Sequence, residues 1–208
     1  MRATRRPGPT ARWADRSRCD PAAPLATIPF ACDCGTLTGE LHVASLSGSH
    51  VACHCADCRA TALYHDRPWD QAEGVAVWHT TPDHVRISSG AERLAAIRVK
   101  PRGFLRWFAS CCGTPLGAST DTAAVPFFGL RTSLLEDDGP LGPKVAEAYL
   151  SRTAPRHRGY GRIVRGVVLR ALLARLSLRR RNPFLDTTGR PAGPVHVLSD
   201  RERAALYE

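Results

Sequence analysis

Short runs in which hydrophobic and polar residues alternate dominate the chain from Leu25 to about residue 109. A period of two is typical of β-strands with one buried face. Turn-forming groups separate the runs, among them Ser47-Gly48-Ser49 and Pro101-Arg102-Gly103. The predicted strands are residues 37–45, 49–53, 74–79, 84–88, 94–100 and 104–109. We therefore expect a mainly β fold with antiparallel strands.

Helical periodicity appears only towards the C-terminal end. Residues 143–151 predict a short helix, with Pro143 suited to its first turn. Residues 160–178 predict a longer helix whose apolar face is formed by Ile163, Val164, Val167, Ala171, Ala174 and Leu178. Arginines interrupt the apolar run before it reaches the about 20 residues that span a bilayer. The apolar face either docks on the β domain, which we favour, or lies on a membrane surface.

The chain has 208 residues, enough for one domain with a hydrophobic core and additional tails. Residues 1–24 are rich in arginine and proline and predict a disordered basic tail. Residues 25–135 form the expected β domain, and residues 136–208 a helical, arginine-rich extension. Ser199 and Glu202 predict a capping box at the start of a last helix. The expected core aromatics are Trp69, Trp78, Phe104, Trp107 and Phe108.

The net charge of +10 belongs to the two flanks of the chain. Residues 1–24 carry +4 and residues 155–181 carry +9, which leaves −3 for the remainder. Such flanks can bind nucleic acid or an anionic membrane, or can be merely solvated. Basic residues are almost all arginine, which a GC-rich genome explains as well as phosphate binding does. We therefore do not expect specific nucleic-acid binding.

Seven of the eight cysteines fall into three tight clusters. The exception, Cys19, lies in the basic tail and is expected to be a free thiol. Clustered cysteines predict either disulfides or metal ligands. Residues 1–24 lack the apolar segment of a secretory signal, so we expect a cytoplasmic protein with reduced thiols. We therefore favour zinc over disulfides.

Two zinc sites follow from the spacing of the clusters. Cys53, Cys55 and Cys58 form a CxCxxC triad in which Cys53 and Cys55 share a strand face and Cys58 returns from a turn. Three protein ligands leave one position open, as in catalytic zinc sites. The second site combines Cys32 and Cys34 with Cys111 and Cys112. These last two residues are adjacent, so both can bind one ion only if the backbone turns between them.

The residues between the triad cysteines have expected roles of their own. His54 should point away from the metal and pack or form a hydrogen bond. Asp57 should brace the turn or orient a ligand.

The three motifs resemble the glutathione-dependent formaldehyde-activating enzyme family, also called the centromere protein V/GFA domain. They comprise residues 32–39 (CDCGTLTG), 53–59 (CHCADCR) and 108–113 (FASCCG), and the resemblance covers about residues 29–130. It implies an Mss4-like β fold, one structural zinc, one zinc at the triad, and the joining of glutathione to formaldehyde. Ala109 stands where the family has the first cysteine of its last motif, which places the chain in a divergent bacterial branch.

Elementary zinc chemistry points in the same direction as this resemblance. Zinc held by three thiolates acidifies water weakly but accepts a thiol readily. The leading hypothesis is a carbon-sulfur lyase of the S-(hydroxymethyl)glutathione synthase type, acting on an adduct between a small aldehyde and glutathione or another thiol. Side chains able to receive its carboxylates are Arg59, which we favour, and Arg67, Arg98, Lys100, Arg102 and Arg131. The alternative is a non-catalytic zinc scaffold whose arginine-rich flanks bind nucleic acid or an anionic membrane.

Overall fold

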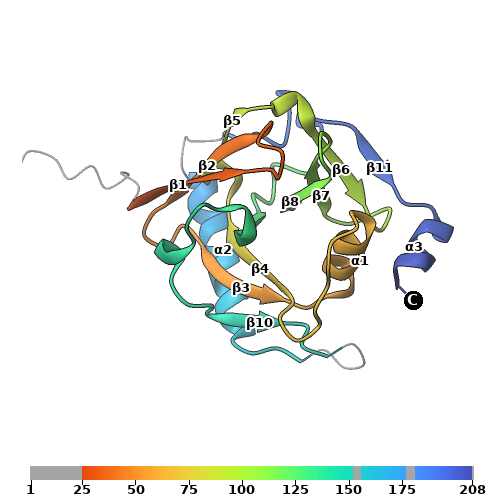
Figure 1. Cartoon of the computed structure of the whole chain (residues 1–208). Helices are drawn as coiled ribbons and strands as arrows, with labels where there is room; N and C mark the ends of the chain where they lie inside the picture. The colour runs from red at the N-terminus through yellow and green to blue at the C-terminus, as the bar shows by residue number, and fades with distance from the viewer. Residues whose placement is uncertain (1–24, 152–155, 177–180, 208) are drawn as a thin grey trace, which may run out of the picture.

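The computed structural model describes residues 25–151, 156–176 and 181–207. The predictions for the tail 1–24 and for Cys19 lie outside these residues. Within these ranges the chain folds mainly into β-strands, which form two sheets, with three α-helices around them (Figure 1). No helix in the described ranges is both long enough and apolar enough to cross a membrane.

The smaller sheet has three antiparallel strands in the order β1-β2-β5. The larger sheet has eight strands in the order β10-β3-β4-β9-β8-β7-β6-β11. Its central pairs are antiparallel, whereas the outermost strands β10 and β11 pair in parallel with β3 and β6. The strands are β1 Ala26–Ala31, β2 Thr38–Val43, β3 Ser49–Cys53, β4 Val75–Thr80, β5 Val85–Ser89, β6 Leu94–Arg98, β7 Leu105–Ala109, β8 Thr114–Ser119, β9 Phe128–Arg131, β10 Ala146–Ala148 and β11 Val195–Val197.

The main hydrophobic core joins residues of both sheets. Leu41 of the small sheet and Trp107 of the large sheet are both fully buried in it. The core also receives Phe184 from the C-terminal region, whose ring stacks on Phe128 with centroids 4.0 Å apart. The Trp107 indole donates a hydrogen bond of 2.8 Å to Ser119, so its polar atom is satisfied in the interior.

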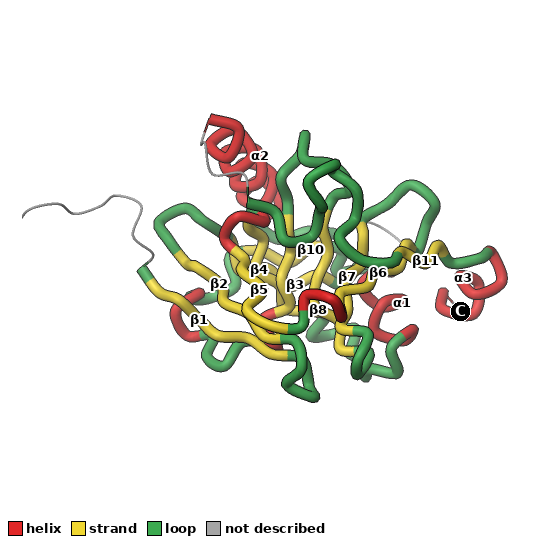
Figure 2. Tube along the Cα trace, turned by 90° about the horizontal axis from the view of Figure 1, so that it is seen from above, coloured by secondary structure: helices red, strands yellow, loops and turns green. Residues whose placement is uncertain are grey.

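The opposite face of the large sheet is covered by helices at two separate places. Helix α1 (Ala56–Tyr64) contributes Ala60 to a cluster with Ile97 of β6. Helix α2 (Tyr160–Leu176) contributes Ile163 to a second cluster with Val51 and Val77. Figure 2 shows α2 at the periphery, at the other end of the molecule from α1 and α3 (Asp200–Tyr207). The strip of sheet between these two clusters carries the polar residues described below.

All six predicted strands are present, and the long helix is confirmed over Tyr160–Leu176. The capping box is confirmed by hydrogen bonds from Ser199 N to Glu202 Oε2 (2.7 Å) and from Glu202 N to Ser199 Oγ (3.3 Å). The short helix predicted over residues 143–151 is wrong. Ala146 and Ala148 are buried on β10 while Glu147 is not, and this period of two belongs to a strand.

Two packing predictions also need correction. Phe104 is 43% exposed, whereas Trp78 and Trp107 do lie in the core. Helix α2 buries Arg170 together with Ile163, and Val164 of the predicted buried face is exposed. The rest of the predicted docking face is confirmed, since Val167, Ala171 and Ala174 are partly buried while the leucines of the opposite face are exposed. Leu178 lies outside the described residues.

We predict that Trp107→Ala lowers the free energy of unfolding by about 3–5 kcal/mol, because it leaves a cavity where two sheets and Phe184 meet. Phe104→Ala is the matched aromatic control and should cost at most about 1 kcal/mol, since 43% of Phe104 is exposed. Urea denaturation of both variants measures the difference. Equal losses would contradict this assignment of the core.

Candidate metal centres

The first cysteine cluster is built by two tight turns from different sheets. Cys32 and Cys34 lie in the turn that joins β1 to β2, which Gly35 closes with a positive φ of 72°. Cys111 and Cys112 lie in the turn that joins β7 to β8, where Gly113 has a φ of 71°. Glycine adopts this left-handed conformation without steric cost.

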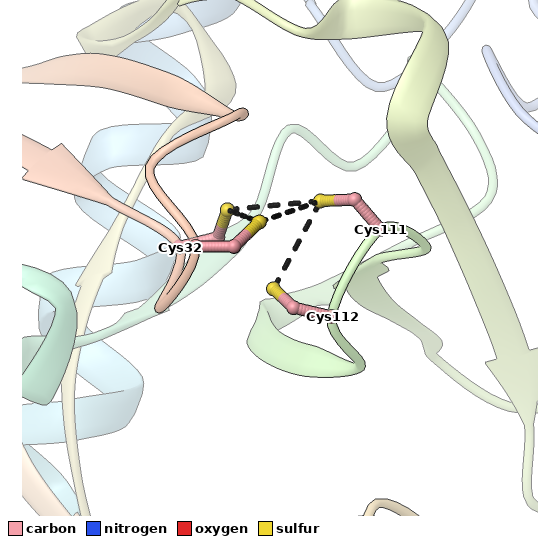
Figure 3. Close-up of side chains that lie close together, drawn as sticks. Cys32, Cys111 and Cys112 are labelled. Atoms are coloured by element: carbon pink, nitrogen blue, oxygen red, sulfur yellow. Dashed lines mark hydrogen bonds between the residues drawn. The ribbon is translucent and has the colours of Figure 1, made fainter.

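The two turns bring all four sulfur atoms together (Figure 3). The Sγ–Sγ distances are 3.5 Å from Cys32 to Cys34, 3.8 Å from Cys32 to Cys111, 3.3 Å from Cys34 to Cys111 and 3.9 Å from Cys111 to Cys112. A tetrahedral site with bonds of about 2.3 Å has ligand–ligand edges of about 3.8 Å. A disulfide would need about 2 Å, and all seven described cysteines are free. The cluster therefore has the dimensions of a four-thiolate metal site.

The surroundings act differently on the thiols of this cluster, since burial and hydrogen bonds with the other cysteines raise the pKa of Cys111 to about 12 while the pKa of Cys34 is lowered. The amide of Leu37 donates a hydrogen bond to Cys32 Sγ at 3.3 Å. Hydrogen bonds with Thr36 lower the pKa of the exposed Cys34 thiol to about 6. Both turns are further joined by a hydrogen bond of 3.1 Å from the amide of Asp33 to Thr114 Oγ1. Residues 110–113 form a turn, so the backbone does change direction at Cys111-Cys112, as binding of one ion by both residues requires.

The second cluster lies where β3 passes into α1. Cys53 is the last residue of β3, Cys55 is the N-cap residue of α1, and Cys58 lies in the first turn of that helix. The Sγ atoms of Cys53 and Cys58 are 3.6 Å apart, and the amide of Cys58 donates to Cys55 Sγ at 3.3 Å. The expectation that Cys55 continues a strand and Cys58 follows in a turn is wrong, because the strand ends two residues earlier. The N-terminus of a helix favours negative charge, so this placement suits thiolates.

The second cluster has three ligands rather than four. All three sulfur atoms lie within 4.8 Å of one another, and no histidine, aspartate, glutamate or further cysteine of the described ranges joins them. The four-cysteine cluster can saturate a tetrahedral ion, whereas the triad would leave one position for another ligand. This difference is the main chemical contrast between the two clusters.

His54 takes the role expected from its place between two ligands. Its side chain is 2% exposed, and its Nδ1 lies 2.9 Å from the carbonyl oxygen of Gln71. Gly74 packs against the ring so closely that a Cβ there would lie 2.7 Å from Nδ1. His54 therefore fixes the loop that follows α1 and is not part of the ligand set.

Asp57 lies at the centre of an ion-pair network beside the triad. Its carboxylate oxygens are 3.2 Å from Lys100 Nζ and 3.6 Å from Arg106 Nη2, and it accepts a hydrogen bond from the Tyr207 hydroxyl. Arg106 in turn donates to Cys58 Sγ at 3.6 Å. The network therefore connects Asp57, through Arg106, to a triad sulfur.

Arg106 is the residue of this centre that sequence reasoning missed. It lies on β7 between the buried residues Leu105 and Trp107, so its side chain points to the other face of the sheet. That face is enclosed by α1, and only 11% of the Arg106 side chain is exposed. A charged residue at a strand position flanked by core residues was the available signal, but the sequence did not indicate that both faces are covered.

The surroundings of the triad shift the pKa values of its thiols in opposite directions. Hydrogen bonds from Cys53 and Cys55, followed by the charges of Arg106 and Arg131, lower the pKa of the buried Cys58 thiol well below its usual value. Hydrogen bonds with Cys55 and Cys58 raise the pKa of Cys53. The protein's own cations thus stabilise one thiolate, and two more thiolates would need a further cation such as a metal ion.

The six predicted carboxylate receptors lie in different surroundings. Arg59, which we had favoured, donates to the carbonyl oxygen of Leu206 at 3.1 Å. Arg67, Arg98 and Lys100 form ion pairs with Asp33, Asp121 and Asp57. Arg102 is exposed in the turn before β7. Arg131 is partly buried, and its charge acts on Cys58 of the triad.

Comparison with known proteins gives a family but no activity. The model of a family of unknown function, DUF6151, matches residues 25–170. A crystal structure of a Rhodobacter sphaeroides protein is similar over 56% of this chain and 96% of that chain, with 20% identity and a TM-score of 0.39. No curated protein matches.

We predict that the purified protein binds about two metal ions per chain, one at each cluster. Cys111→Ser should reduce the content to about one ion and lower the melting temperature, because the four-cysteine cluster joins the two sheets. Elemental analysis and thermal denaturation provide the two measurements. Cys19→Ser, at the cysteine outside the three motifs of the sequence, is the matched control and should change neither value. Full metal content in Cys111→Ser would contradict the four-ligand assignment.

Proposed function

This chain belongs to the DUF6151 family, and we propose that it is a two-zinc, Mss4-like protein that joins a thiol to a small aldehyde or cleaves the product. The observation that carries the proposal is the contrast between a cluster of four cysteines and a triad that lacks a fourth protein ligand among the described residues. The resemblance of the three cysteine motifs to the formaldehyde-activating enzymes supports the same reaction class.

Zinc is the metal that fits both sets of ligands best. Sites made only of cysteine favour soft or borderline ions, and zinc accepts them in tetrahedral geometry without redox chemistry. The sulfur separations of 3.3–3.9 Å at the four-cysteine cluster suit such a geometry. Cys32, Cys34, Cys111 and Cys112 would hold a structural ion, and Cys53, Cys55 and Cys58 a reactive one.

At the triad, zinc would supply a Lewis-acidic position that favours binding of a deprotonated thiol over activation of water, because three thiolates already give the ion a net charge of −1. The proposed reaction forms one bond between the thiol sulfur and the carbonyl carbon of the aldehyde. The proton of the thiol ends on the former carbonyl oxygen, so no oxidant or reductant is needed. Cleavage is the same process in reverse.

The surrounding residues would stabilise the triad thiolates and fix their position. The hydrogen bond from Arg106 to Cys58 reduces electron density on that sulfur and offsets the negative charge of the site. Asp57 positions Arg106, and Lys100 and Tyr207 position Asp57. Such partners of metal ligands typically change metal affinity or activity by about 10- to 100-fold.

We predict that zinc-loaded protein binds glutathione saturably and that Cys55→Ser abolishes this binding. The reason is that serine removes one of only three anchors of the ion. Calorimetric titration measures the affinity, and S-methylglutathione, which has no free thiol, is the matched control ligand. Equal binding of glutathione and its S-methyl derivative would rule out the thiol mechanism.

The outer face of α2 favours a second function, which is contact with an anionic membrane surface. Large aliphatic side chains project from it, each 41–82% exposed, at Val164, Val168, Leu169, Leu172, Leu173 and Leu176. Residues 156–176 contain arginines but no acidic residue. An apolar face next to positive charge suits the headgroup region of a bilayer, whereas nucleic acid would contact the charges and leave the leucines in water.

We predict that the protein co-sediments with vesicles containing anionic lipid and that the double variant Val168→Glu, Leu172→Glu reduces binding at least about tenfold. Two carboxylates on this face would oppose both burial and the attraction between opposite charges. Val197→Glu, which changes an exposed aliphatic residue on β11 at the end of the large sheet opposite to α2, is the control and should bind normally. Failure of the unmodified protein to bind anionic vesicles at low salt would refute this function.

A further inference from the structure

Arg131 is a partly buried arginine without a partner. It is the last residue of β9, and no hydrogen bond or ion pair joins its guanidinium group to any other residue in the described part of the chain. A guanidinium group carries five N–H donors. None of its nitrogen atoms is fully buried, so these donors are open to water and to an incoming acceptor.

The strand register places Arg131 on the same side of the large sheet as the triad. Arg131 lies opposite Val77 of β4, and Cys53 lies opposite Val75, two residues earlier on the same strand. Residues directly opposite in antiparallel strands, and residues two apart along a strand, share a face. Arg131 and Cys53 therefore project from one face, and the charge of Arg131 acts on Cys58.

Arg106 reaches the same region from the next part of the sheet. Arg106 lies opposite Ala118, and Ala118 lies opposite Gly129, which is two residues from Arg131. The two arginines are close enough for each charge to disfavour the other. Between them the sheet carries Ala118 and Gly129, and the rings of His79 and Phe127 lie beside Gly129, at 3.5 and 3.7 Å from a Cβ built there.

The two arginines differ in how their charges are compensated. Arg106 has both a carboxylate partner, Asp57, and a sulfur acceptor, Cys58. Arg131 has neither, although burial lowers the pKa of its guanidinium group. A metal-filled triad would bring one negative charge nearby but no oxygen that could accept the donors of Arg131.

We infer that Arg131, with Arg106 beside it, forms an anion subsite next to the open position of the triad and receives a carboxylate of the thiol substrate. The inference rests on the proposed function and narrows its substrate class to small thiols that carry a negative charge. A planar guanidinium group can bind a carboxylate through two parallel hydrogen bonds, which would fix the orientation of the thiol at the metal. Arg131 would then be a positioning and specificity residue.

Three thiols of similar size test this inference on the zinc-loaded protein by calorimetric titration. The probes are 3-mercaptopropionate, which is anionic, 2-mercaptoethanol, which is neutral, and cysteamine, which is cationic. We expect 3-mercaptopropionate to bind about 10- to 100-fold more tightly than 2-mercaptoethanol, the range for one hydrogen-bonded charge pair, and cysteamine to bind most weakly. Arg131→Gln should bring the ratio between the affinities for 3-mercaptopropionate and 2-mercaptoethanol close to one, and Arg131→Lys should retain part of the preference.

Arg102→Gln is the matched control, because it removes a positive charge from an exposed turn, and it should leave the series unchanged. If no thiol binds the unmodified protein, the proposed function itself fails. If all three thiols bind it equally, the subsite fails and the thiol function remains. If Arg131→Gln weakens all three by the same factor, Arg131 only compensates the charge of the triad. The series on the unmodified protein decides between the first two outcomes even if a variant does not fold.

Discussion

The convergence of four cysteine sulfur atoms from two separate turns is the constraint on which the arrangement of this protein depends. One turn belongs to the small sheet and the other to the large sheet, and their sulfur atoms lie 3.3–3.9 Å apart. Thiolates held this close repel one another unless a cation lies between them. A bound metal would therefore act as a cross-link between the sheets, directly beside the core residue Leu37, whose amide contacts Cys32.

The triad also consists of cysteines, but the local backbone brings only three of them together. At the first cluster, two turns each offer two cysteines. At the second, a single strand-to-helix junction offers three, and its N-cap geometry directs Cys55 and Cys58 towards Cys53. The surrounding elements supply arginines in place of a fourth ligand. A site with three thiolates and adjacent cations is suited to an exchangeable anionic ligand, and a closed four-thiolate site is suited to stability.

Much of this arrangement could be predicted from the sequence. The alternation of residues identified six strands, and the spacing of the cysteines identified the members of both clusters before their geometry was known. Short elements were harder to predict from the sequence. Strand β10 has only three residues and becomes a strand through pairing with β3, a contact that local sequence does not encode. Helix α1 begins inside the CxCxxC motif, whose apparent strand period concealed it.

The residues around the triad were harder to predict than its ligands, for a related reason. Metal ligands can be identified from residue type and spacing, whereas the sequence does not distinguish Arg106 and Arg131 from other arginines on strands. Their significance depends on the covering of the second face of the sheet by α1 on one side and α2 on the other. Only the tertiary structure shows that this strip lies between two helices and next to the triad, and this position makes its charged side chains informative. Arg59 illustrates the converse: it is next to Cys58 in sequence, yet its hydrogen bond is directed to the C-terminal helix.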